Sequence, residues 1–195
     1  MDISRKLVDK YVIGDREYTL NLAFNVVLKV IELMRDDSVD EINRLFTALF
    51  LFFGEDVRGD LTLEIATESF MDIFDTYVRM ENEEADVVRD IKGNIIPREI
   101  IDKSKSEEDD KPLYDISQDG EYIYSSFMQA YGIDLFDEQN KMHWHKFNAL
   151  LSGLPSDTKF AEVIRIRSWK PSKGESSEYK KEMRRLQEVY RLSTS

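Results

Sequence analysis

Three successive segments in the first 80 residues place apolar side chains three and four positions apart, which is the spacing of one face of an α-helix. An amphipathic helix of this kind is stabilised mainly by packing its apolar face against other elements, so the three segments need one another. The predicted faces are Ala23, Val27, Val30, Ile31 and Met34; Ile42, Leu45, Phe46, Leu49, Phe50 and Phe53; and Leu63, Ala66, Phe70, Ile73, Phe74 and Tyr77. We therefore expect a bundle of helices in the N-terminal part of the chain.

Residues with capping chemistry predict where two of these helices begin and end. Asn21 is a candidate N-cap for the first helix because its side chain can accept a hydrogen bond from a free backbone N–H. Ser38 and Glu41 have the spacing of a capping box, which would open the second helix. Gly54 follows that helix and is predicted to end it. Ahead of the helices, residues 11–19 alternate around a Gly-Asp pair, which predicts a short β-hairpin.

Helical spacing returns after residue 113. Ser117 is predicted to cap a helix that ends at Gly132, and a second helix is expected over residues 137–152. Either Ser156 or Asp157 would cap a third. Aromatic side chains gather on these helices, and a buried core is the favoured interpretation, with a partner-binding groove as the alternative. They are Tyr122, Tyr124, Phe127, Tyr131, Trp144 and Phe147.

A last helix, expected from about Glu175, carries only a narrow apolar stripe on an otherwise charged surface. The stripe is thin for a core element and wide enough to dock on another protein. Trp169 stands beside Lys170-Pro171, at a helix end where burial is harder. The candidate partner-binding residues are therefore Trp169, Tyr179, Met183 and Tyr190.

Residues 81–112 interrupt the helical pattern with acidic and serine-containing runs, which predict a linker or mobile loop. Within it, residues 91–97 form a short apolar island that could be a second hairpin around Gly93-Asn94. The expected architecture is mainly α: two small helical subdomains joined by an acidic linker, with a short N-terminal β-hairpin. The predicted boundaries are 1–80, 81–112 and 113–195.

The sequence contains no recognisable catalytic, cofactor-binding or metal-binding set. It has no cysteine, no glycine-rich phosphate loop and no Gly-x-Ser-x-Gly elbow, so we expect no enzyme activity and no cofactor. His143 and His145 are the only histidines. Two positions apart on a helix, they would point about 200° away from each other and could not share a metal. We expect a structural pair, one side chain buried and the other exposed.

The charge is concentrated in the middle of the chain, where residues 55–111 hold 18 acidic and 8 basic side chains. A net charge of −12 repels phosphate, so nucleic-acid binding is disfavoured; a regulator that binds DNA through the basic C-terminal helix is the minor alternative. No apolar run is long enough for a membrane span or a signal peptide, which predicts a protein of the host cytoplasm.

Several segments resemble the gene-product-15 family of bacteriophage proteins from long-tailed phages of Gram-positive hosts. The resemblance rests on Gly14-Asp-Arg-Glu-Tyr and, more specifically, on Tyr114-Asp-Ile-Ser-Gln-Asp-Gly-Glu-Tyr-Ile-Tyr-Ser-Ser-Phe, Tyr131-Gly-Ile-Asp-Leu, His143-Trp-His-Lys-Phe, Ala149-Leu-Leu-Ser-Gly-Leu and Asp157-Thr-Lys-Phe. His145 departs from the pattern, because the family favours tryptophan there.

The resemblance implies a role in tail assembly. Members resemble, in gene position, the chaperones that keep the tape-measure protein soluble until the tail tube polymerises around it. The expected partner is thus the phage tape-measure protein, with the major tail protein and self-association as further candidates. A chaperone of this kind is absent from the mature virion. The alternative is a structural virion component, such as a head-completion or tail-junction protein.

Overall fold

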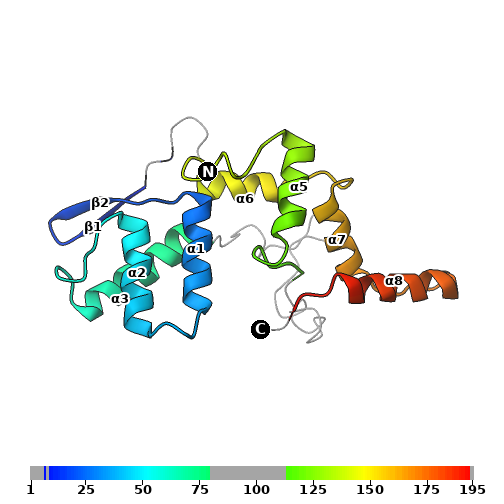
Figure 1. Cartoon of the computed structure of the whole chain (residues 1–195), viewed down its shortest axis with the longest axis horizontal. Coiled ribbons are helices and arrows are strands. Elements are labelled where there is room, and N and C mark those ends of the chain that lie inside the picture. Colours follow the sequence, from blue (N-terminus) through cyan, green and yellow to red (C-terminus); the bar gives the residue numbers. More distant parts are fainter. Residues whose placement is uncertain (1–6, 8, 80–112, 194–195) are drawn as a thin grey trace, which may run out of the picture.

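A computed structural model describes residues 7, 9–79 and 113–193, and it confirms a mainly helical protein with a short N-terminal hairpin (Figure 1). Strand β1 (Lys10–Ile13) pairs antiparallel with β2 (Arg16–Thr19), and Gly14 makes the turn at a φ of 60°. Tyr18 points from β2 into the core and stacks on Phe53 with ring centroids 4.4 Å apart. The hairpin is thereby fastened to the helices.

The three predicted apolar faces pack together as helices α1 (Phe24–Arg35), α2 (Glu41–Phe53) and α3 (Leu63–Ile73). The last of these continues into a π-helical turn, η1 (Phe74–Val78). Val27, Val30, Leu49, Phe52 and Ile73 are completely buried between them. Gly54 ends α2 in the left-handed conformation at a φ of 73°, as predicted.

The predicted starts of the first two helices are wrong. Asn21 does not cap α1; the helix begins after Ala23, and Phe24 donates its backbone N–H to the Met142 carbonyl at 2.9 Å. Ser38 does not open α2, because its backbone and hydroxyl both donate to Asp36. Asp40 is the cap instead, and it accepts from the Asn43 backbone at 3.0 Å.

The second half contains α5 (Gly120–Tyr131), α6 (Trp144–Ser152), α7 (Lys159–Ser168) and α8 (Ser177–Val189). Gly132 ends α5 as predicted. In α8 the cap is Ser176, whose hydroxyl accepts from Tyr179 N–H, so the helix begins two residues after the expected Glu175.

The starts of α5 and α7 also differ from the predictions: a local turn at Asp115 precedes α5, and a tertiary contact accompanies the start of α7. Ser117 stands before α5, whose N-cap is Asp119. Neither Ser156 nor Asp157 caps α7; its N-cap is Thr158, and Phe160 N–H donates to the buried Ser126 hydroxyl of α5 at 2.9 Å.

The expected helix over 137–152 is shortened to α6, because residues 137–142 form turns in front of it. Asn140, at a φ of 59°, exchanges two hydrogen bonds with the buried Asn25 of α1 at 2.8 and 3.1 Å. This reciprocal pair holds the turn against the first half and prevents the helix from beginning earlier.

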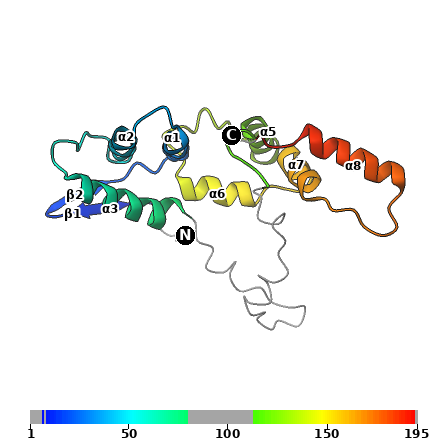
Figure 2. The ribbon, with the colours of Figure 1, turned by 90° about the horizontal axis from the view of Figure 1, so that it is seen from below.

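The two halves meet around α6, which lies between α1 and α5 in both views (Figures 1 and 2). Trp144 N–H donates to the Leu22 carbonyl at 2.7 Å, and an isolated β-bridge joins Ala23 to His143. The rings of Phe24 and Phe147 stack across the junction at 5.0 Å. One cluster of buried side chains runs from Tyr18 to Phe160, so the described halves share a core. Their separability at 1–80 and 113–195 stays a prediction, and the predicted linker and its second hairpin lie outside the described residues.

Candidate partner-binding surfaces

The aromatic side chains of the second half are mainly core, as favoured from the sequence. Phe127, Trp144 and Phe147 are buried, and the Trp144 indole N–H donates to the Val78 carbonyl at 3.0 Å. Tyr131 is half-buried, and its hydroxyl donates to the Leu150 carbonyl at 2.9 Å. Most of the aromatic residues of α5 and α6 therefore stabilise the packing of the helices, while half-buried Tyr122 also lines a surface pocket beside Tyr190.

Much of the predicted C-terminal contact stripe is used within the chain. Met183 is only 8% exposed, and Trp169 is half-buried with its ring edge-on to Tyr179 at 6.1 Å. Tyr190 packs edge-on against Tyr122 at 5.9 Å, and its hydroxyl accepts from Lys159 Nζ at 2.7 Å. Through these contacts, the residues of the stripe pack α8 against α7 and α5. Of the four predicted residues Tyr179 has the most open side chain, at 48% exposed, and the role of all four in partner binding stays a prediction.

A buried ion pair fixes the C-terminal segment. Asp119, 1% exposed, accepts two hydrogen bonds from the Arg167 guanidinium, at 2.6 and 2.8 Å. Arg167 also donates to the backbone carbonyls of Tyr190 and Leu113, at 2.6 and 3.0 Å. One side chain thus ties together α5, α7, the end of α8 and the chain entering at residue 113. The sequence pattern did not pair these two residues, because they lie 48 positions apart.

The histidines lie side by side, which corrects the expected opposite orientation. His143 is the N-cap of α6 and is not helical, so its ring stacks against His145 at 5.2 Å. Its Nδ1 accepts the backbone N–H of His145, and its Nε2 lies 2.6 Å from an Asp9 carboxylate oxygen. The proton of the neutral ring therefore belongs on Nε2, where it can be donated to Asp9. Both side chains are half-buried, and burial lowers the pKa of His145, with His143 beside it a further cause.

Within the described ranges, no cluster of three or more His, Cys, Asp or Glu side chains is arranged to hold a metal ion. Among the residues that the structure describes, no helix is long and apolar enough to cross a membrane.

An apolar groove of about 400 Å³ lies between α2 and α3. Ile42, Leu63 and Met71 line it and are 52%, 50% and 51% exposed, which is unusual for large apolar side chains on neighbouring elements. Buried Leu45 and Phe70 also line it, together with half-buried Met34 at the end of α1. We refer to this feature as the α2–α3 groove.

Ile42, Phe50 and Leu63 belonged to the predicted buried faces, and their exposure is a correction. Ile42 stands in the first turn of α2, Phe50 in its last turn, and Leu63 is the first residue of α3. A side chain at a helix end has fewer neighbouring turns to cover it. The predicted helical positions of these residues were therefore right, but their predicted burial was wrong.

Charge around the α2–α3 groove is mainly negative. Glu41 and Arg44 are its charged lining residues, and Arg44 donates to Asp37 at 3.1 Å and to the Met34 carbonyl at 3.3 Å. Along α3, exposed Glu64, Glu68 and Asp72 each follow by one position a residue that lines the groove. The α3 segment contains no lysine or arginine.

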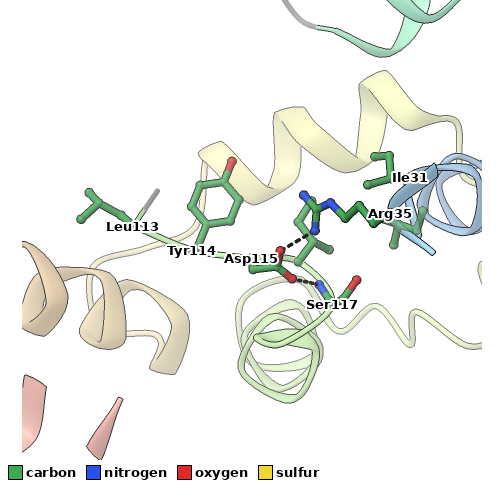
Figure 3. Close-up of a pocket in the computed structure, with 8 residues that line it drawn as sticks. Ile31, Arg35, Leu113, Tyr114, Asp115 and Ser117 are labelled. Atoms are coloured by element: carbon green, nitrogen blue, oxygen red, sulfur yellow. Dashed lines mark hydrogen bonds and ion pairs between the residues drawn. The ribbon is translucent and has the colours of Figure 1, made fainter. Parts of the chain in front are cut away.

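A second groove, of about 340 Å³, lies where α1 faces the chain entering the second half (Figure 3). Leu28, Ile31 and Arg35 of α1 line it on one side, and residues 113–117 on the other. Arg35 donates to Asp115 at 2.6 Å across the groove. Burial acts to raise the pKa of Asp115, but the hydrogen bond from the Gln118 backbone and then the pairing with Arg35 lower it. Because the charged groups along this groove are already paired with each other, it serves as part of the contact between the halves.

The fold and these surfaces define a class of protein: a small, mainly helical protein whose described residues present apolar grooves. The family described as Bacteriophage Gp15 protein matches residues 3–192, so the chain belongs to this family of bacteriophage proteins. The comparison with curated proteins and the comparison with solved structures both found no match.

Proposed function

We propose that this bacteriophage protein is a tail assembly chaperone of a siphophage that infects a Gram-positive host. It binds the tape-measure protein in the host cytoplasm and keeps it soluble until the tail tube polymerises. The observation that supports this role is the α2–α3 groove, which exposes three large apolar side chains on an acidic protein. The family membership and the predicted absence of enzyme activity agree with it.

The physical requirement for such a chaperone is modest. A long amphipathic helix self-associates through its apolar stripe unless another surface covers that stripe. A groove with methionines suits this purpose because their flexible side chains adapt to different apolar partners, and Met34 and Met71 line this one. The groove is small, so each copy binds weakly enough to be displaced and several copies are needed along one tape-measure helix.

Co-expression tests the proposal. The wild-type protein should keep the phage's tape-measure protein in the soluble fraction and purify with it at several copies per tape-measure chain. The double variant Leu63→Gln/Met71→Gln should lose this activity, because it places amides on the apolar face of the groove.

The matched control is Val12→Gln/Val189→Gln, which changes two exposed valines that do not line the groove. It should behave like the wild type, provided both variants keep the wild-type circular dichroism spectrum. Failure of the wild type to bind or solubilise the tape-measure protein contradicts the proposal. Retention of the protein at full stoichiometry in purified virions also contradicts it, and favours a head-completion or tail-junction component.

A further inference from the structure

We infer that the α2–α3 groove selects an amphipathic helix whose apolar stripe is flanked by lysine or arginine on the side that meets α3. The inference rests on the proposed function and names the chemistry of the tape-measure segment that binds.

Residues four apart on a helix lie in one row along its surface. One such row on α3, Leu63, Thr67 and Met71, lines the groove. The next row, Glu64, Glu68 and Asp72, is exposed and follows it by one position around the helix, and Asp72 also interacts with Tyr11 of the hairpin. A helix lying in the groove would therefore meet apolar side chains on its inner face and the carboxylates of Glu64 and Glu68 along one edge.

Among the described residues, the one basic side chain that lines the groove is already engaged. Arg44 lines the groove, but it pairs with Asp37 and donates to the Met34 carbonyl. Glu41 adds another carboxylate to the lining on the α2 side. An occupant with acidic flanks would bring like charges together, whereas lysine or arginine at its edge would form exposed ion pairs.

The apolar row also limits the length of the occupant. From Leu63 to Met71 a helix rises roughly 12 Å, which is a little over two turns. A bound helix would therefore place apolar side chains at positions i, i+3 or i+4, and i+7 against the groove. Short repeats of this pattern, each flanked by basic residues, are the segments of a long helix that the protein would occupy.

Two fluorescently labelled helical peptides of equal length and identical apolar stripe test the inference. One carries lysine and arginine beside the stripe, and the other carries glutamate at the same positions. Fluorescence anisotropy at low salt should show the basic peptide binding about tenfold more tightly, the sum of a few modest exposed ion pairs. The preference should shrink at high salt, where screening weakens exposed pairs, while the common apolar contribution remains.

Variants of the acidic row provide the second measurement. Glu68→Lys should reduce or reverse the preference, and Leu63→Gln/Met71→Gln should weaken both peptides. Glu178→Lys on α8 is the matched control, because it also reverses one exposed helical acid and should leave the preference unchanged. If circular dichroism shows that Glu68→Lys does not fold, the inference is tested by the wild type alone, through the salt dependence of its preference for the basic peptide.

Equal binding of the two peptides overturns the inference. Absence of peptide binding by a protein that still solubilises the tape-measure protein overturns it too, and leaves the proposed function standing. If the protein neither binds the peptides nor solubilises the tape-measure protein, both the inference and the proposed function are contradicted. A concentration-dependent dimer that excludes the basic peptide would assign the groove to a second copy of the chain, and so also overturns the inference.

Discussion

At the scale of single residues, the pair formed by Arg167 and Asp119 has the largest predicted effect on stability. Removing one partner of a buried ion pair leaves the other charge without compensation and costs about 3–5 kcal/mol. Arg167→Met should therefore lower the free energy of unfolding by an amount of this order, measured by urea denaturation. It also removes the hydrogen bonds to Tyr190 and Leu113, so α8 should become more sensitive to proteases.

The control for this experiment is Arg185→Met. Arg185 pairs with Glu182 at 2.7 Å, but both side chains are more than half exposed, at 63% and 53%. An exposed pair of this kind contributes at most about 1 kcal/mol, so the variant should resemble the wild type. Equal losses in the two variants would contradict the structural role assigned to Arg167.

His145 predicts how stability depends on pH. Its pKa is lowered below the ordinary value of 6.5, so below that pH the unfolded chain binds a proton more readily than the folded protein. Because the folded protein keeps this side chain neutral, the free energy of unfolding decreases progressively as the pH falls from about 6.5 toward the lower pKa that His145 has in the folded state. The free energy of unfolding should decrease between pH 7.5 and pH 5.5, as measured by urea denaturation at each pH.

The variant His145→Gln should show a smaller decrease over the same interval, because glutamine does not titrate. Asp115 also has a lowered pKa, but its stabilising effect is lost only as the pH falls below its unfolded value of about 3.9, outside this window. An unchanged pH dependence in the variant would show that another group is responsible.

At the scale of elements, two residues compete as the N-cap of α2. The sequence suggests Ser38, whereas in the structure Asp40 accepts hydrogen bonds from the backbone and the side chain of Asn43. Asp40→Ala should therefore cost about 1 kcal/mol of unfolding free energy, the usual value for losing an N-cap. Ser38→Ala should cost less, since its hydroxyl supports only the turn at Asp36. The reverse order, measured by thermal or urea unfolding, would favour the capping box.

Helix α8 illustrates how an apolar stripe can be interpreted in two ways. Its narrow stripe suggests a surface for a partner, and in the structure Met183 and Tyr190 also pack the helix against the second half. Gln187 strengthens this docking by donating from its amide to the carbonyls of Ile166 and Trp169, at 3.0 and 2.8 Å. The sequence correctly predicted that the apolar residues of α8 share one face. The neighbouring helices determined which of these residues are buried.

At the scale of the whole molecule, the shared core predicts cooperative unfolding. Phe24, Trp144 and Phe147 join the halves, so loss of either half exposes apolar side chains of the other. Urea denaturation followed by tryptophan fluorescence and by circular dichroism should give one coincident transition. Trp144 reports on the junction, and a Trp169→Phe variant isolates its signal, since the chain has two tryptophans. Two separated transitions would instead support independent subdomains at the predicted boundaries.

The helical character, the hairpin and the stops at Gly54 and Gly132 could be predicted because each depends on residues close together in the chain. Apolar spacing identifies the face that a helix will bury, and glycine is favoured where the backbone becomes left-handed. The same local patterns carried the resemblance to the phage family. They also placed Phe127, Trp144 and Phe147 in a core before any partner for them was known.

Tertiary structure alone decided the starts of α1, α6 and α7, the orientation of the histidines and the position of the exposed groove. Several polar residues near each helix start have capping chemistry, and contacts such as those of Asn25 with Asn140 or Phe160 with Ser126 select among the starts. Exposure of Ile42 and Leu63 depends on how α2 and α3 pack, which spacing along one helix does not encode. The sequence therefore determined which surfaces are apolar, and the packing of distant elements determined which of them remain open to a partner.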